Sequence, residues 1–146
     1  MKTFGKYGKM KINEFIKNNL KVTNLAKNKD LLRCVKPIDL KNENMMTSTR
    51  LPQIVCSDGF EMSVQVGFSL YSTPKKVAKR YTAVEIGFPS EHEPLIEEYA
   101  ETFYKDDGED VTDYTDTVYP YVPVRIVDKV LKKHGGINMT ETLSKV

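Results

Sequence analysis

The middle of the chain alternates between apolar and polar residues, which is the pattern of half-buried β-strands. Two such runs, 53–56 and 60–66, lie on either side of Ser57-Asp58-Gly59. An Asp-Gly pair between β-prone runs favours a tight hairpin. The sequence therefore predicts an antiparallel hairpin at this point.

The register of this hairpin follows if Asp58 and Gly59 form a two-residue loop. Ser57 would then pair with Phe60. Because side chains alternate along a strand, one face of the second run is predicted to be core. That face consists of Phe60, Met62, Val64 and Val66.

Two more strands are predicted further along the chain. In 81–88, three apolar residues alternate with Ala83, Glu85 and Gly87, and Pro89-Ser90 ends the run. In the segment 117–122, apolar and polar residues alternate sufficiently to predict a fourth, short strand. The predicted inward residues of the third strand are Val84, Ile86 and Phe88.

Two helices are predicted to cover the apolar face of the sheet. Ser90 is a candidate N-cap for a helix over 91–104, with Glu93 completing a capping box. A second helix begins at Pro123 and ends at Gly135-Gly136, because Pro suits a first turn and Gly a C-terminal cap. The apolar stripe of the first contains Leu95, Ile96, Tyr99 and Phe103, and that of the second Ile126, Val127, Val130 and Leu131.

The first fifty residues have a different composition, rich in Lys and Asn. Ile12, Phe15, Ile16 and Leu20 form one apolar stripe at helical spacing, which Leu25, Leu31 and Leu32 extend or repeat. Residues 36–50 have the composition of a linker. We predict a basic helical N-terminal arm (1–50), an α+β core domain (51–137) with a small antiparallel sheet of three to four strands packed against two helices, and a frayed tail (138–146).

Charge is segregated along the chain although the total is only +2. Residues 1–50 contain twelve Lys or Arg against four Asp or Glu, whereas 91–116 contain eleven carboxylates and the single cation Lys105. An uneven distribution of charge gives information about binding partners rather than about the fold.

The acidic stretch suggests that the protein presents negative charge to a surface built for nucleic-acid phosphates. A solvated surface that maintains solubility is the ordinary alternative. A calcium loop at Asp106-Asp107-Gly108 is disfavoured, since the alternating ligands of the EF-hand pattern are absent. The candidate partner-binding residues are Glu97, Glu98, Glu101, Asp106, Asp107, Glu109, Asp110 and Asp113.

The basic arm has two interpretations as well. Lys2, Lys6, Lys9 and Lys11, interleaved with Phe4 and Tyr7, have the chemistry to contact phosphates and stack on bases. A solvated Lys/Asn-rich extension has the same composition. Direct nucleic-acid binding is the less favoured prediction, because the acidic stretch opposes it.

A second candidate surface is the polar face of the sheet. Ser63, Gln65, Tyr81 and Glu85, with Cys56 beside them, are expected there. Convergent polar groups on rigid strands hold small polar ligands, and a nucleotide-type ligand would suit this face. The commoner fate of such a face is simple exposure to water.

No catalytic, cofactor or metal signature is present in the sequence. Cys34 and Cys56 have no metal-ligand spacing and are expected to be reduced thiols, and His134 suits the end of a helix. His92 lies between two glutamates whose side chains point in different directions on a helix. No run of eighteen apolar residues and no secretory leader is evident, so we predict a cytoplasmic, non-enzymatic protein without cofactor or membrane partner.

Four motifs follow one another along the chain: Cys56-x-Asp58-Gly59-Phe60-x-Met62-Ser63-Val64-Gln65, Tyr81-Thr82-x-Val84-Glu85-x-Gly87-Phe88-Pro89-Ser90, Thr117-Val118-Tyr119-x-Tyr121-Val122-Pro123-Val124 and His134-Gly135-Gly136-Ile137. Together they resemble a family of small uncharacterised proteins of tailed phages and prophages. The resemblance spans about residues 53–137 and carries no catalytic residues. It implies a phage context, in which small proteins often inhibit host defence.

These observations lead to a functional prediction. The protein is expected to inhibit a host defence protein or ribonucleoprotein, in the manner of an anti-CRISPR protein, through its acidic surface. The alternative is a sponge that sequesters a nucleotide immune signal on the polar face of the sheet. A homodimer would be unsurprising, because an antiparallel sheet of this kind leaves an edge strand.

Overall fold

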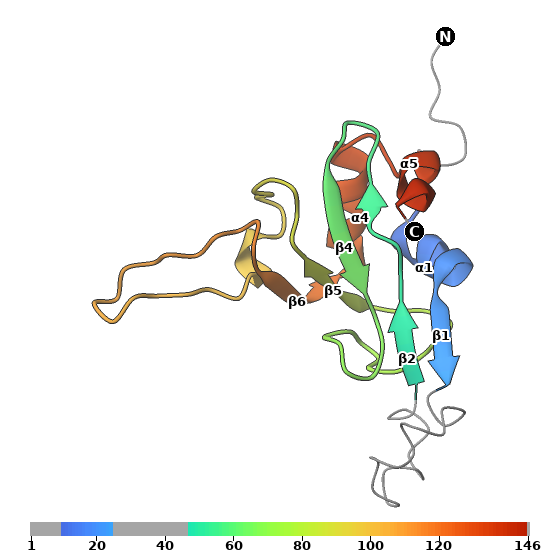
Figure 1. Cartoon of the computed structure of the whole chain (residues 1–146), viewed down its shortest axis with the longest axis horizontal. Helices are drawn as coiled ribbons and strands as arrows, with labels where there is room; N and C mark the ends of the chain where they lie inside the picture. The colour runs from blue at the N-terminus through green and yellow to red at the C-terminus, as the bar shows by residue number, and fades with distance from the viewer. Residues whose placement is uncertain (1–9, 25–46, 146) are drawn as a thin grey trace, which may run out of the picture.

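The computed structural model describes residues 10–24 and 47–145, which form an α+β structure (Figure 1). Its centre is an antiparallel sheet of four strands in the order β3-β4-β5-β6. The strands are β3 (Ile54–Val55), β4 (Glu61–Gln65), β5 (Ala83–Gly87) and β6 (Val118–Pro123). The predicted fold class is therefore confirmed.

Helices and a two-stranded ribbon complete the structure. The helices are α1 (Ile12–Asn19), α4 (Val124–Lys133) and α5 (Met139–Ser144), with the 3-10 helix η3 (Glu97–Tyr99). Antiparallel β1 (Lys21–Asn24) and β2 (Thr47–Arg50) form the ribbon. The predicted linker character of 36–50 is thus wrong for 47–50, while Leu25, Leu31 and Leu32 lie outside the described residues.

The core lies between the sheet and the helices α1 and α4. Each helix or strand contributes the apolar residues that its periodicity places on one face. The predicted inward set of β4 is buried, as are Ile12, Phe15 and Ile16 of α1 and Val127, Val130 and Leu131 of α4, whereas Leu20 and Ile126 are half-buried. The largest fully buried apolar side chains are Tyr81, Tyr119, Phe15, Ile12, Ile54, Met62, Ile86, Ile96, Leu131 and Ile137.

The hairpin between β3 and β4 has three loop residues rather than the predicted two. Cys56 donates its N–H to the Phe60 carbonyl at 2.8 Å, and Ile54 lies opposite Met62. Gly59 adopts a φ of 95°, a left-handed conformation that suits glycine, and Asp58 Oδ1 accepts from Phe60 N–H. The Asp58 side chain thus stabilises a longer loop, which moves the register by one residue on the β3 side.

The third strand ends one residue earlier than predicted. Phe88 has a φ of 50° and is exposed, so its side chain leaves the core face that Val84 and Ile86 occupy. Tyr121 in β6 has a φ of 53° at a register shift opposite β5. The two exposed aromatic residues mark positions where the regular alternation breaks.

Helix α1 is part of the body, not a free arm. Its first backbone N–H, from Ile12, donates to Asp128 of α4 at 2.8 Å. Asn13 and Tyr81 form a reciprocal pair, in which each donates an N–H to an oxygen of the other. These bonds join α1 to α4 and to the segment just before β5.

The residues after Gly136 form the helix α5 and pair with the outer edge of β3; they are not the frayed tail that was predicted. Asn138 caps α5 by accepting from Glu141 N–H, and Asn138 N–H donates to the Val55 carbonyl at 2.8 Å. Thr142 Oγ1 accepts from Val55 N–H at 3.0 Å. The prediction of a tail missed this helix because its apolar pattern is short, and its stability comes from pairing with the outer edge of β3.

None of the helices in the described residues has the length and hydropathy needed to cross a bilayer.

Candidate functional site: an acidic hairpin

The acidic segment does not form the predicted helix over 91–104. Only three of its residues, Glu97–Tyr99, form the 3-10 helix η3. Pro94 disfavours helical backbone at the residue before it, which is Glu93. The predicted capping box is also absent, because Ser90 is paired with Glu61 of β4 through two hydrogen bonds of 2.8 and 2.9 Å.

Residues 101–116 instead form a long hairpin that projects from the body, which we call the acidic hairpin (Figure 1). Val111 donates to the Phe103 carbonyl at 2.9 Å, and Lys105 donates to that of Glu109 at 2.8 Å. Gly108, with a φ of 85°, turns the tip. Thr117 anchors the base by donating its hydroxyl to the Glu101 carbonyl. Loop character was predicted for 105–116, but the paired arms and their projection were not.

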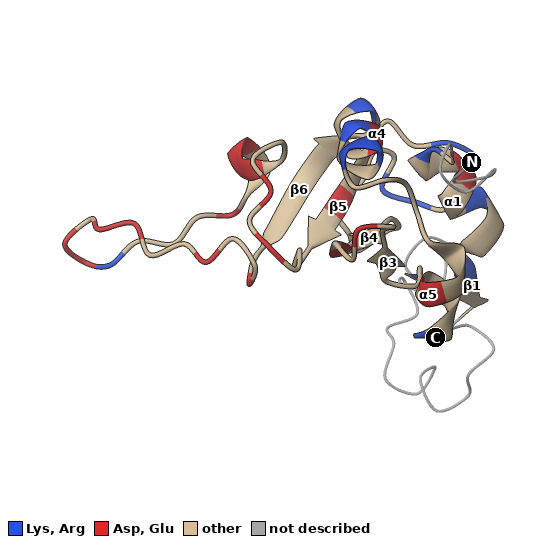
Figure 2. Ribbon diagram, turned by 90° about the horizontal axis from the view of Figure 1, so that it is seen from above, with Lys and Arg blue, Asp and Glu red and all other residues tan. Residues whose placement is uncertain are grey.

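The hairpin and its base carry all eight predicted partner-binding carboxylates. Glu97 and Glu98 lie on η3 beside the base, whereas the other six lie on the hairpin: Glu101, Asp106, Asp107, Glu109, Asp110 and Asp113. Figure 2 shows these acidic positions at one end of the molecule, whereas basic positions lie in the body, on α4, α1 and β1 among other segments. The charge segregation of the sequence is therefore also a segregation in space.

Two hairpin carboxylates are held ionised by their neighbours. The hydroxyl and backbone N–H of Thr112 donate to Asp110, and those of Thr115 donate to Asp113 in the same way. These hydrogen bonds lower the pKa of both carboxyls. Both side chains therefore carry full negative charge near neutral pH.

The acidic hairpin also exposes apolar surface. Phe103, Tyr104 and Val111 are 51%, 61% and 43% exposed on the two arms. Tyr114 lies nearer the base and stacks on His92, whose ring contacts Glu97 at 2.6 Å. Exposed aromatic rings among carboxylates are a combination suited to contact with a protein, because aromatic side chains dominate the energetics of interfaces.

The alternative ligand site on the sheet is only partly assembled. Ser63, Gln65 and Glu85 do lie together: Gln65 donates to Ser63 at 3.1 Å and is paired with Glu85 across the strands. The Gln65 amide also donates to, and accepts from, the backbone of Leu51. Glu85 accepts from Tyr71 N–H at 3.1 Å. These polar groups hold loops in place.

Tyr81 and Cys56 were expected on this polar face, and that expectation is wrong. Tyr81 precedes β5, so strand alternation does not extend to it; its hydroxyl is buried between Lys76 and Ala78. Cys56 is 1% exposed in the core. Burial, with a contribution from Asp58, raises the pKa of the Cys56 thiol to about 12. A thiol of this kind is a poor nucleophile at neutral pH.

Sequence reasoning missed a buried ionic cluster at the C-terminal end of α4. His134 Nδ1 lies 2.6 Å from Asp58 Oδ2, and Nε2 lies 2.6 Å from Glu93 Oε1. Lys133 adds an ion pair to Glu93 at 2.8 Å, and Phe60 stacks on the imidazole at 4.0 Å. Glu93 and His134 are 1% and 4% exposed. No local signal reveals this cluster, since its members are far apart in sequence.

Both ring nitrogens of His134 face carboxylate oxygens, so each is placed for a hydrogen bond. Burial by itself raises the pKa of Glu93, but hydrogen bonds from Lys133, Leu95 N–H and His134 more than offset it, so that pKa lies below its usual value. Asp58 and Glu93 thus both bond to His134, and Glu93 also pairs with Lys133, which is the arrangement of a structural clasp.

Among the described residues, no group of three His, Cys, Asp or Glu side chains is placed to hold a metal ion.

The predicted nucleic-acid contact falls mostly outside the described residues. Of its members, only Lys11 is described, and it is exposed; those outside are Lys2, Phe4, Lys6, Tyr7 and Lys9.

Comparisons with known proteins give no relative for this chain: no family model, no curated protein and no solved structure matches it.

Proposed function

We propose that the protein is a non-enzymatic inhibitor that binds a basic, nucleic-acid-binding surface of another protein or ribonucleoprotein through its acidic hairpin. The observation that carries the proposal is the hairpin itself, a projecting element that bears carboxylates and exposed aromatic rings. Carboxylates at such a surface attract the Lys and Arg side chains that otherwise contact phosphates. The resemblance to phage proteins suggests the target, a host defence complex such as a CRISPR–Cas effector.

Three features support this proposal over a purely solubilising role. A solubilising surface gains nothing from extending Tyr104 and Phe103 into water, because apolar exposure carries a free-energy cost. The hairpin contains ordered arms, which lowers the entropy lost when it binds. The negative charge is gathered at one end of the molecule, where it steers association with a basic partner.

The test is a double charge reversal at the tip, Asp106→Lys with Glu109→Lys. Both residues are exposed, and Glu109 is paired only with exposed Lys105 in the described part of the chain. We expect loss of at least tenfold in inhibition of plasmid interference by a panel of DNA-targeting CRISPR–Cas complexes. Affinity of the wild type for the inhibited complex should fall as salt rises from 50 to 300 mM.

A matched control is Glu14→Lys with Glu141→Lys, which changes the net charge equally at exposed positions outside the acidic hairpin. The control variant should inhibit as the wild type does. Equal inhibition by wild type and tip variant would contradict the role of the hairpin. Absence of inhibition by the wild type across the panel would contradict the proposed target class.

The nucleotide sponge on the polar face of the sheet has less support. The Gln65 amide is committed to the Leu51 backbone, and Glu85 is committed to Tyr71.

A further inference from the structure

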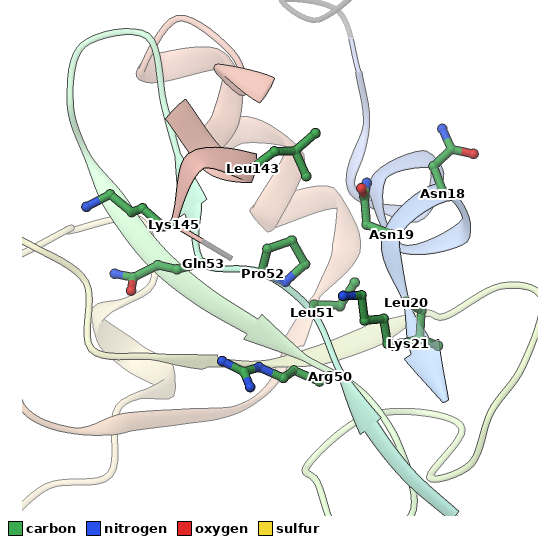
Figure 3. Close-up of a pocket in the computed structure, with 10 residues that line it drawn as sticks. All are labelled: Asn18, Asn19, Leu20, Lys21, Arg50, Leu51, Pro52, Gln53, Leu143 and Lys145. Carbon is green, nitrogen blue, oxygen red and sulfur yellow. The ribbon is translucent and has the colours of Figure 1, made fainter. Parts of the chain in front are cut away.

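A pocket of about 620 Å³ lies far from the acidic hairpin, between α1, the β1–β2 ribbon and the end of α5 (Figure 3). Its volume falls in the range of roughly 300 to 1,000 Å³ that small-molecule sites occupy. Three cations line it, namely Lys21 of β1, Arg50 of β2 and Lys145 after α5. No carboxylate is among its lining residues.

Lys21 and Arg50 face each other across the ribbon as direct cross-strand partners. Like charges in this position destabilise a strand pair. Lys145 has a counter-ion, since its ammonium lies 3.3 Å from Glu61. Within residues 10–24 and 47–145, no ion pair involves Lys21 or Arg50. An anion seated between the two would convert this repulsion into attraction.

The other residues that line the pocket indicate which further chemical groups a bound anion should have. Leu51, Pro52 and Leu143 supply an apolar surface, and the Gln53 amide supplies a hydrogen-bonding group. Asn18 and Asn19 also line the pocket, but the Asn19 amide donates to the Phe15 carbonyl at 2.8 Å. In Figure 3 the ends of Lys21 and Leu143 point toward the space over Pro52, while Arg50, Gln53 and Lys145 extend in a common direction on another side. The pocket thus combines positive charge, an amide and a flat apolar contact.

The floor of this pocket is hydrogen-bonded to the central sheet. Gln65 of β4 donates to, and accepts from, the backbone of Leu51, and Thr49 donates its hydroxyl to the Val66 carbonyl. These bonds tie β2 and the segment after it to the central sheet. A pre-formed floor reduces the entropy that a ligand must overcome.

We propose that this pocket binds a nucleotide, whose phosphate draws the side chains of Lys21 and Arg50 together and whose base lies over Pro52 and Leu143. The planar fork of an arginine donates two parallel hydrogen bonds to a phosphate, and lysine adds a point charge. The Gln53 amide provides a donor and an acceptor for the sugar or base. This site is separate from the polar face of the sheet and from the acidic hairpin, so the inference does not depend on the proposed function.

The test is ligand-observed NMR of the full chain with AMP, GMP, CMP and UMP, each compared with its nucleoside. We expect saturation transfer to at least one nucleotide and at least tenfold weaker binding of the matching nucleoside. Arg50→Glu should weaken nucleotide binding at least tenfold. Inorganic phosphate should compete only at much higher concentration, because it lacks the base.

The matched control is Arg125→Glu on the exposed side of α4, which makes the same change of charge outside the pocket. It should leave nucleotide binding within twofold of the wild type. Absence of transfer to all four nucleotides would overturn the inference. Equal binding of nucleotide and nucleoside, or equal weakening by Arg50→Glu and Arg125→Glu, would also overturn it.

Thermal unfolding without ligand separates loss of the site from loss of the fold. Arg50→Glu replaces a repulsive cross-strand pair by an attractive one, so its Tm should rise by about 2 °C while binding is lost. A Tm that falls by several degrees would show that Arg50 serves the fold, and would count against the inference.

Discussion

His134 joins three separate segments through its two ring nitrogens. Asp58 belongs to the hairpin loop before β4, Glu93 to the segment after β5, and His134 to the end of α4. Removing one partner of a buried ion pair leaves an uncompensated charge, which costs more than the pair itself contributes. The clasp is therefore expected to be sensitive to single substitutions.

Glu93→Gln should lower the free energy of unfolding by about 3 kcal/mol at pH 7, since it leaves His134 and Lys133 without their buried counter-charge. Urea denaturation monitored by circular dichroism measures this. Glu97→Gln is the control, because the His92–Glu97 pair is exposed and such pairs contribute under about 1 kcal/mol. Equal effects of the two variants would show that the clasp does not stabilise the fold.

The same residues predict a pH dependence. Burial raises the pKa of Asp58, but hydrogen bonds from Phe60 N–H and His134 reverse this, and the pKa of Glu93 is also below its usual value of 4.5. A lowered folded-state pKa gives stability that is present above the unfolded pKa and lost as the pH falls through the folded one. Wild-type stability should therefore decline below about pH 5.

The comparison of wild type with Glu93→Gln identifies the source of this decline. Because the variant lacks one titrating carboxylate of the clasp, the difference between the two unfolding free energies should shrink from pH 7 to pH 3. Urea titrations at several pH values would show it. A constant difference would assign the acid sensitivity to other groups.

At the scale of elements, α5 protects the outer edge of the sheet. Strand β3 is at the end of the strand order, and its outward backbone groups pair with Asn138 and Thr142. An uncovered edge would be a template for pairing with another chain. The C-terminal residues thus satisfy the outward backbone groups of β3.

Thr142→Val tests this role at nearly constant volume. It removes the hydroxyl that accepts from the buried Val55 N–H, and an unsatisfied buried donor costs about 1 to 3 kcal/mol. Amide exchange at Val55 should accelerate and the free energy of unfolding should fall. The control, Thr140→Val, lies on the exposed side of the same helix and should change little. Identical exchange rates at Val55 would contradict the capping role.

At the scale of the whole molecule, the acidic hairpin and the body are expected to be separable. Replacing 104–110 by Asn-Gly preserves the bond from Val111 N–H to the Phe103 carbonyl, which is the geometry of a two-residue turn. The removed residues are all exposed. The Tm should stay within about 2 °C, whereas binding through the hairpin is lost. A large fall in Tm would show that the hairpin supports the fold.

The sequence by itself determined the elements whose side chains follow a regular period. The buried face of β4, the stripes of α1 and α4, and the glycine cap after His134 were all readable locally, because one face of each element must leave water. The acidic block was also evident, since charge does not depend on the fold for its sign.

Only the tertiary structure decided where contacts distant in sequence replaced local preference. Glu93 contacts His134 instead of capping a helix, and Thr142 bonds to the edge strand β3. Lys21 lies opposite Arg50. In each case a polar or charged group meets another that is distant in sequence. The local pattern of apolar and polar residues carries no information about such contacts. For the same reason the projection of the acidic hairpin and the basic pocket could not be predicted from the sequence pattern.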